Sequence, residues 1–293
     1  MKKTLTEEKV GLLLILPNYI IYLVFVLIPV FYVVYLGFTN YDLINKPKFT
    51  GMENYMKLAG DEVFRAGILN TFIYSLFTII PGMALGLVIA VILNNKSIKG
   101  IPAIRACYFI PNIVSMVAAA MVWLWIYDPA QGLLNSVITK IGFARQDWLF
   151  DMYLALPSII IVGLWMGLGY NMIIYLAGLQ GIPEDLYEAA TIDGATRVRQ
   201  FFHITLPMLQ PTTFFLFVMA CIKSFQVFDQ VYIMTNGGPA NATTTIVHRL
   251  YENAFQFYKM GYGSSMAVFL LVITTFVTVI NFKYGNQGTD TSL

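Results

Sequence analysis

Residues 183–207 read PEDLYEAATIDGATRVRQFFHITLP and form a polar stretch between two long apolar runs. Pro183 can begin a helix, because the first turn of a helix leaves its N–H groups unpaired, and the two acidic residues after it then lie where the helix dipole favours anions. Gly194 can adopt the left-handed conformation that ends a helix, and we expect the helical pattern that resumes after it to stop before Pro207. The stretch therefore predicts two short helices that meet at Gly194.

The first of these helices has a weak apolar face. Its apolar residues are too few and too small to fill a core of their own, so another surface must cover them. We expect that surface to belong to another chain. The residues concerned are Leu186, Ala189, Ala190 and Ile192.

The spacing within residues 183–207 resembles the cytoplasmic EAA loop of membrane subunits of ATP-binding-cassette (ABC) importers. An ordinary amphipathic loop is the alternative, and a lone Glu-Ala-Ala triplet would favour it, but the matching residues extend to the end of the stretch. The resemblance implies a helix-turn-helix that contacts a cytoplasmic ATPase and transmits its motion into the membrane. The implied coupling residues are Glu188, Ala189, Ala190, Asp193, Gly194, Ile204, Leu206 and Pro207.

The composition is that of a membrane protein. Hydrophobic residues make up 58% of the chain and charged residues 12%, whereas about a quarter of a soluble domain is charged; the mean hydropathy is +0.68. Several apolar stretches are long enough to cross about 30 Å of hydrocarbon, and they lack the alternating pattern of barrel strands. We therefore expect an all-α fold with six transmembrane helices in a single domain, residues 1–293. The expected spans are approximately 10–37, 68–93, 105–127, 154–180, 211–234 and 264–283.

The first apolar run could also be interpreted as a secretory signal peptide, because it follows the basic start MKKTLTEEKV. The run from Val10 to Gly37 is longer than a signal core and shows no evident cleavage site. It also contains Pro17 and Pro29, which a spanning helix tolerates. We expect it to be kept as the first spanning helix.

Charge gives little information about orientation. Lysine and arginine are divided almost evenly between the two sides of the expected topology, so the positive-inside rule does not decide. A cytoplasmic 183–207 loop after the fourth span requires both termini to be cytoplasmic. This orientation agrees with Lys2 and Lys3 at the start of the chain.

Two further segments resemble the carbohydrate-importer branch of the ABC importers, which includes the maltose permeases. They are FTGMENYMKL at 49–58 and Phe228-Asp229 followed by the turn TNGGP at 235–239. The resemblance covers nearly the whole chain. It implies a bacterial cytoplasmic-membrane subunit that pairs with a second, similar permease, contacts a dimer of ATPases and receives a sugar from an extracytoplasmic binding protein.

The chain contains no P-loop of the form GxxxxGK[ST]. We therefore expect no catalytic residue and no cofactor on this chain, with ATP and Mg²⁺ bound by the partner ATPase. Nor does the sequence contain the basic patch with interleaved aromatic residues that nucleic acid requires. Cys107 and Cys221 both fall in apolar spans, which predicts small buried side chains rather than a disulfide or a metal site.

Lys223 is a charged residue well inside an expected span. A charged side chain inside the membrane is energetically unfavourable, so it often marks a functional site. Ser224, Gln226 and Asp229 follow it and extend a polar stripe. Two interpretations remain open. Lys223 lies on a sugar pathway, or it pairs with a carboxylate or carbonyl and fixes the packing between two permease subunits.

Positions that correspond to the sugar contacts of maltose permeases can be carried over by their distance from the coupling loop. A lysine among them does not suit a neutral disaccharide well, so an acidic saccharide or a phosphorylated polyol is the alternative cargo. Further candidates are Trp165, Tyr170 and Asn171, and the glycines nearby suit close helix packing equally well. The carried-over residues are Asn112, Met116, Met166, Gly167, Lys223, Ser224 and Val227, with Gly163 beside them.

Three other functions are alternatives to an importer subunit. A secondary transporter needs coupled ionisable groups in its spans, and Lys223 with one nearby aspartate gives it little support. An intramembrane enzyme needs a nucleophile or a metal cluster, whereas His203 and His248 lie outside the expected spans. A purely structural scaffold would explain the helices but not the spacing of the 183–207 loop.

Overall fold

The computed structural model describes residues 7–95 and 99–285, and in these residues it contains helices and no strand. The one strand-like pairing among them is an isolated bridge between Thr39 and Phe49. Lys2, Lys3 and Lys96, and the polar tail at 286–293, lie outside the described residues. The predicted all-α fold class is confirmed.

The described helices include five that are long and apolar enough to cross a membrane, and a bent pair that can supply a sixth span. Each overlaps one of the spans expected from the sequence, which supports a multi-pass membrane protein. The five are Gly11–Gly37, Glu62–Leu93, Ala155–Gln180, Gln210–Met234 and Met260–Lys283, and the bent pair is Ile101–Ile113 with Met116–Ile126.

The third expected span is not the continuous helix that the sequence suggested. It consists of α5 (Ile101–Ile113) and α6 (Met116–Ile126), which meet at an angle of 100°. Pro111 has no N–H to donate to the preceding turn, and α5 ends two residues later. Val114 and Ser115 then adopt extended backbone, with ψ of 141° and 134°, and turn the chain into α6.

The chain divides into two compact units, the first formed by residues up to Asp61 together with Leu250–Leu271. Asn54 holds the described part of this unit together, because its buried Nδ2 donates to the carbonyls of Gly37 (3.0 Å) and Thr39 (2.7 Å). The Tyr262 hydroxyl also donates to Asp61 (2.9 Å). The helical elements of this first unit are α1 (Glu7–Tyr22), η1 (Leu23–Leu27), α2 (Ile28–Gly37), α3 (Glu53–Gly60), η3 (Glu252–Gln256) and the first part of α15 (Met260–Gly285).

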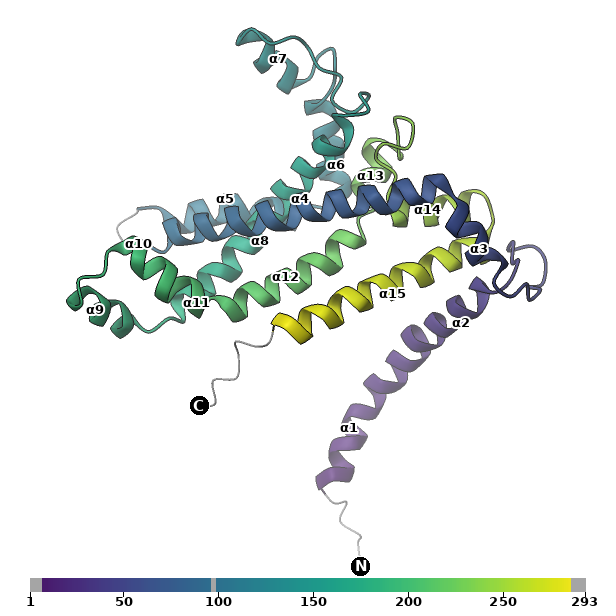
Figure 1. Cartoon of the computed structure of the whole chain (residues 1–293), viewed down its shortest axis with the longest axis horizontal. Helices are drawn as coiled ribbons and strands as arrows, with labels where there is room; N and C mark the ends of the chain where they lie inside the picture. Colours follow the sequence, from purple (N-terminus) through teal and green to yellow (C-terminus); the bar gives the residue numbers. More distant parts are fainter. Residues whose placement is uncertain (1–6, 96–98, 286–293) are drawn as a thin grey trace, which may run out of the picture. The chain divides into compact units, whose positions relative to one another are not determined.

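The second unit contains Glu62–Arg249 and the chain from Val272 onwards. Its long helices α4 (Glu62–Leu93), α8 (Ala155–Gln180) and α12 (Gln210–Phe225) pack side by side, and α5 lies along α8 (Figure 1). The short helix α13 (Asp229–Met234) packs against α6. The helix α14 (Ile246–Tyr251) begins in this unit and ends in the first.

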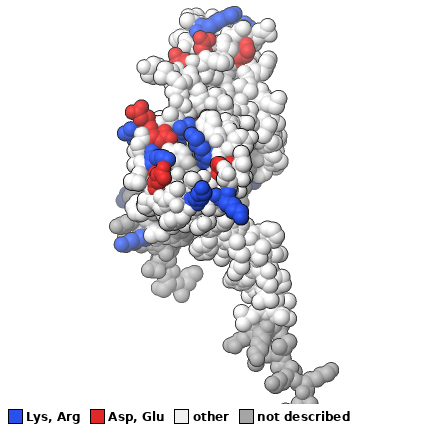
Figure 2. All heavy atoms as spheres, turned by 90° about the vertical axis from the view of Figure 1, so that its right-hand side faces the viewer, with Lys and Arg blue, Asp and Glu red and all other residues white. Residues whose placement is uncertain are grey.

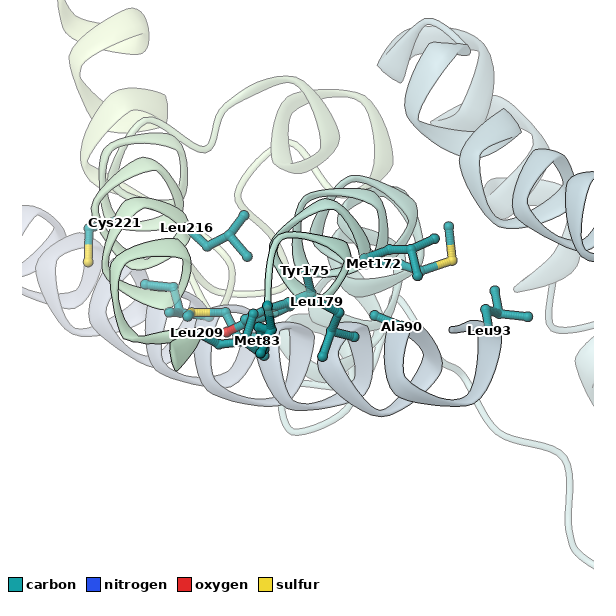
Figure 3. Close-up of a cluster of buried hydrophobic side chains, with 12 residues drawn as sticks. Met83, Ala90, Leu93, Met172, Tyr175, Leu179, Leu209, Leu216 and Cys221 are labelled. Atoms are coloured by element: carbon teal, nitrogen blue, oxygen red, sulfur yellow. The ribbon is translucent and has the colours of Figure 1, made fainter. Parts of the chain in front are cut away.

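Apolar side chains from α4, α8 and α12 form the core of the second unit (Figure 3). Ala90, Met172 and Leu209 are fully buried there. Gly169 lets α8 approach the α5 backbone at Tyr108 and Phe109 closely, and a methyl group at this position would collide with them. The labelled members of the core are Met83, Ala90, Leu93, Met172, Tyr175, Leu179, Leu209, Leu216 and Cys221.

Cys221 is buried in this core, as the sequence predicted. The same prediction is wrong for Cys107, whose side chain is exposed on α5, because the described chain does not cover that side of the helix. No group of His, Cys, Asp and Glu side chains suited to holding a metal ion occurs among the described residues.

Large apolar side chains are exposed along the candidate spans. On the first of them, Leu14, Phe25 and Phe31 are 76%, 73% and 69% exposed. Charged side chains instead gather in separate groups on the face shown in Figure 2, and most of the other described surface there is uncharged. Such a surface suits lipid rather than water.

Asn135 is the organising residue of the segment around α7 (Leu133–Lys140). It is 2% exposed, its Nδ2 donates to the carbonyls of Pro129 (3.1 Å) and Gln146 (2.9 Å), and its Oδ1 accepts from Gln146 N (3.1 Å) and Trp148 Nε1 (3.1 Å). Replacing Asn135 with alanine leaves these groups unpaired, which costs about 2 kcal/mol or more locally. We expect hydrogen exchange of the backbone amides in residues 129–149 to become about tenfold faster or more.

Val137→Ala is the matched control, because Val137 lies on the same helix but is 50% exposed. In Val137→Ala, the backbone amides of residues 129–149 should exchange at the wild-type rate. Unchanged exchange in Asn135→Ala would contradict the structural role assigned to this side chain.

Candidate functional site

A cavity of about 310 Å³ lies in the second unit, and its wall is formed by α4, α5, α6, α8, α12, α13 and the turn that joins α12 to α13. All seven pathway residues that the sequence predicts line it, so the fold brings together positions that lie far apart in the chain. Whether they contact a substrate stays a prediction. The seven are Asn112, Met116, Met166, Gly167, Lys223, Ser224 and Val227; Gly163, Tyr170 and Asn171 line the cavity as well, and Trp165 is not among its lining residues.

The polar side of the cavity depends on a break between α12 and α13. The helix ends after Phe225, where Gln226 N donates to the Lys223 carbonyl (3.2 Å) and Val227 N to the Ser224 carbonyl (3.3 Å). Phe228 has φ −141° and ψ −62°, and α13 then starts at Asp229. The sequence predicted a continuous span over 211–234; the polar run KSFQVFDQ was the available signal that it is interrupted.

Lys223 carries the positive charge of the cavity. Its side chain is exposed, and its Nζ lies 4.6 Å from the centre of the Tyr170 ring, a cation–π contact between α12 and α8. Lys223 makes no salt bridge among the described residues. Asp229, also exposed, lines the same cavity from the first turn of α13, so the wall offers both a cation and a carboxylate.

The wall residues that sequence reasoning missed include a hydrogen-bonded pair, Gln230 and Tyr74. Gln230 on α13 is 2% exposed and donates through Nε2 to the hydroxyl of Tyr74 on α4, which is 6% exposed. Both line the cavity. A glutamine inside an apolar run was a signal for Gln230, but nothing in the sequence paired it with a tyrosine so far away in the chain.

The loop 183–207 contains the two short helices that the sequence predicted. They are α9 (Glu184–Ile192) and α10 (Arg197–Gln200). Between them Gly194 has φ +75°, in the left-handed region, which confirms its role at the turn. Gly194 N donates to the Thr191 carbonyl (3.0 Å) and Ala195 N to the Ala190 carbonyl (2.9 Å), which pairs the last carbonyls of α9.

The expectation that the second helix stops before Pro207 is wrong. A π-helical turn (Phe201–Thr205) follows α10, and helical backbone continues through α11 (Leu206–Met208). Leu206 N donates to the Phe201 carbonyl, five residues back. The extra residue in this wider turn accommodates the proline, which lies in the first turn of α11, where no N–H is needed.

Side-chain contacts hold the two halves of the loop together. The Tyr187 hydroxyl and Thr205 Oγ1 are 2.8 Å apart, and Gln200 Nε2 donates to Thr191 Oγ1 (2.9 Å). The α9–α10 unit can therefore move as one body. Tyr187 and Gln200 belong to none of the matched loop positions.

The loop exposes large apolar side chains that the described chain does not cover. None of the residues of α9 is buried, and Ile192, Val198 and Phe202 are 87%, 68% and 56% exposed. This agrees with the expectation that another surface covers the helix. Of the predicted coupling residues, Glu188, Ala189, Asp193, Gly194, Leu206 and Pro207 are exposed, and Ala190 and Ile204 are half-buried.

Comparisons with known proteins agree with this arrangement. A family model described as "Binding-protein-dependent transport system inner membrane component" matches residues 82–285, more than half of the chain. The trehalose/maltose transport system permease protein MalF of Thermococcus litoralis is 35% identical over 288 residues, which cover 97% of this chain and 96% of that protein. The arabinooligosaccharides transport system permease protein AraP of Bacillus subtilis is 32% identical over 269 residues, covering 91% and 85%.

Among solved structures, a chain of the bacterial alginate ABC transporter in complex with alginate pentasaccharide-bound periplasmic protein has a similar fold. The TM-score is 0.85 at 24% identity, over 97% of this chain and 96% of that chain. The likeness at this identity concerns the fold. Together with the family match and the apolar helices, it shows that the chain belongs to the family of binding-protein-dependent transport system inner membrane components, the multi-pass permease subunits of ABC importers.

Proposed function

We propose that this chain moves a sugar or oligosaccharide into the cytoplasm through the 310 Å³ cavity. The observation that carries the proposal is the convergence of all seven predicted pathway residues on that one cavity. The printed names of MalF and AraP, which concern trehalose, maltose and arabinooligosaccharides, support a saccharide as the cargo. The family assignment favours this function over a secondary transporter.

The chemistry of the wall suits a hydroxylated ligand. The volume lies at the lower end of the range for ligand pockets, about 300–1,000 Å³, so the cavity has room for a small part of a larger saccharide. Asn112, Asn171 and Gln226 offer amide groups that can replace the water bound to sugar hydroxyls. Tyr170 and Phe228 add aromatic rings.

A second candidate cargo is an acidic saccharide or a phosphorylated polyol. Lys223 favours it, because its ammonium group lies at the cavity wall and makes no salt bridge among the described residues. Asp229 on the same wall opposes it, since a carboxylate repels an anionic ligand. The two side chains have opposite effects on an anionic ligand, so a measurement of uptake must decide the charge of the cargo.

The proposed assembly contains a second, homologous permease subunit, a dimer of cytoplasmic ATPases and an extracytoplasmic binding protein. ATP and Mg²⁺ bind to the ATPases, and this chain contributes no catalytic group. Closure of the ATPase dimer moves α9 and α10 as a lever, with Glu188 in a charged contact, and the spans alternate between outward and inward access. In this proposed assembly, the 183–207 loop and both termini lie in the cytoplasm of a bacterial cell.

The test is ATP hydrolysis by this chain reconstituted with the permease, ATPase and binding protein encoded beside it. The binding protein is offered trehalose, maltotriose, arabinotriose, a trigalacturonate and glycerol 3-phosphate in turn. We expect stimulation of hydrolysis by one of these loaded ligands, and the charge of that ligand decides between the two candidate cargoes. An assembled complex that none of them stimulates would contradict the proposed cargo class.

A further inference from the structure

Gln230 has an unusual position in the cavity wall. Its side chain is almost fully buried, yet its Oε1 has no hydrogen-bond partner among the described residues. Most buried polar groups in proteins are hydrogen-bonded, because an unpaired one is destabilising. Gln230 lines the cavity, so a molecule in the cavity is the available source of a partner.

The amide group of Gln230 is held by a tyrosine on α4, which itself packs against α8. Its Nε2 donates to the hydroxyl of Tyr74 on α4. That hydroxyl lies against Gly163 on α8, where an added methyl group would collide with it. The absence of a side chain at Gly163 thus allows Tyr74 to reach Gln230, and this contact holds the amide group in place.

Gln226, four residues earlier, gives a useful contrast. It lines the same cavity, but its side chain is exposed and can be hydrated before any ligand arrives. A ligand that binds Gln226 exchanges one hydrogen bond for another. A ligand that binds Gln230 pairs an oxygen that has none, so this second bond contributes more to binding.

We propose that Gln230 is a specificity-determining residue, whose Oε1 accepts a hydrogen bond from a hydroxyl group of the transported saccharide. This inference rests on the proposed function of the cavity. It adds selectivity to that function. At the α13 end of the cavity Gln230 Oε1 accepts a hydrogen bond, and at the α12 end Lys223 Nζ donates one, so the cavity selects a ligand that donates at the first end and accepts at the second. A ligand without a free hydroxyl at the α13 end is rejected.

The test compares Gln230→Met, Gln230→Glu and the control Gln131→Met, at an exposed glutamine outside the cavity lining, in the reconstituted complex, with uptake measured for each of the five ligands named above. Methionine has a similar volume but no comparable acceptor. Glutamic acid has nearly the same shape and, when protonated, can donate to Tyr74 and still accept from the ligand. We expect maximal uptake of the transported saccharide to fall about tenfold in Gln230→Met, the size of one hydrogen bond, and to stay within about twofold of wild type in the other two variants.

Thermal unfolding of the same complexes separates a ligand contact from a structural role. Gln230→Met removes the hydrogen bond to Tyr74 together with the unpaired oxygen, and these two effects on stability have opposite sign, so its melting temperature should stay close to that of wild type. A lower melting temperature together with an equal loss of uptake in Gln230→Glu would assign Gln230 a structural role and overturn the proposal. Wild-type uptake in Gln230→Met would overturn it alone, whereas a wild-type complex that transports none of the ligands would overturn the proposed function and this inference together.

Discussion

Gly194→Val is expected to reduce uptake by more than about tenfold while the chain stays in the membrane and ATP turnover continues without transport. Gly194 has φ +75°, and a β-branched residue adopts this conformation at a cost of roughly 1–3 kcal/mol. Valine therefore favours a different turn and changes the angle between α9 and α10. The lever then no longer transmits the motion of the ATPase.

Crowding does not contribute to this effect, because a methyl group built at Gly194 meets no atom within 4 Å. This makes Gly194→Asn a sharp control, since asparagine adds a side chain of similar size but tolerates the left-handed region. It should retain most of the uptake. Uptake and hydrolysis are measured in the same proteoliposomes, and normal transport by Gly194→Val would count heavily against the lever.

Lys223→Glu is expected to change uptake in a way that depends on the charge of the cargo. If the cargo is anionic, its uptake should fall by more than about tenfold, because an attraction of about 1 kcal/mol at this exposed side chain becomes a repulsion of similar size. Uptake of a neutral saccharide should change much less. Lys140→Glu makes the same replacement on α7, away from the cavity lining, and should change neither.

The neutral variant Lys223→Gln distinguishes the two roles left open for this side chain. On a substrate pathway, the variant alters uptake but leaves the amount of assembled complex unchanged. If Lys223 instead fixes the packing between two permease subunits, less of the second permease should copurify, whatever the cargo. The contact of Nζ with the Tyr170 ring supplies a companion variant, Tyr170→Leu, which frees the ammonium without removing its charge.

Much of the fold followed from the composition, because the bilayer allows few alternatives to long apolar helices. All six expected spans correspond to helical stretches in the described chain. The 183–207 loop could also be predicted, since Pro183 restricts the backbone and Gly194 permits the left-handed conformation of the turn. Local signals were least reliable at proline: Pro111 precedes a 100° bend, whereas Pro207 lies within continuing helix, and the difference depends on hydrogen bonds of the neighbouring turns.

In the cavity too, some features were visible in the local sequence and others depend on helix packing. Lys223 stood out in the sequence because a charge inside an apolar run is costly wherever the chain folds. The convergence of Gly163, Tyr74 and Gln230, by contrast, depends on how α4, α8 and α13 pack.

The sequence by itself determined the helical class, the approximate spans, the turn at Gly194 and the family, because each depends on residues that are near one another in the chain. Only the tertiary structure decided which polar side chains share one cavity, which loop residues stay exposed, and that Gln230 is buried with an oxygen unpaired among the described residues. These properties arise from contacts between helices that are distant in sequence, and no local pattern of residues specifies them.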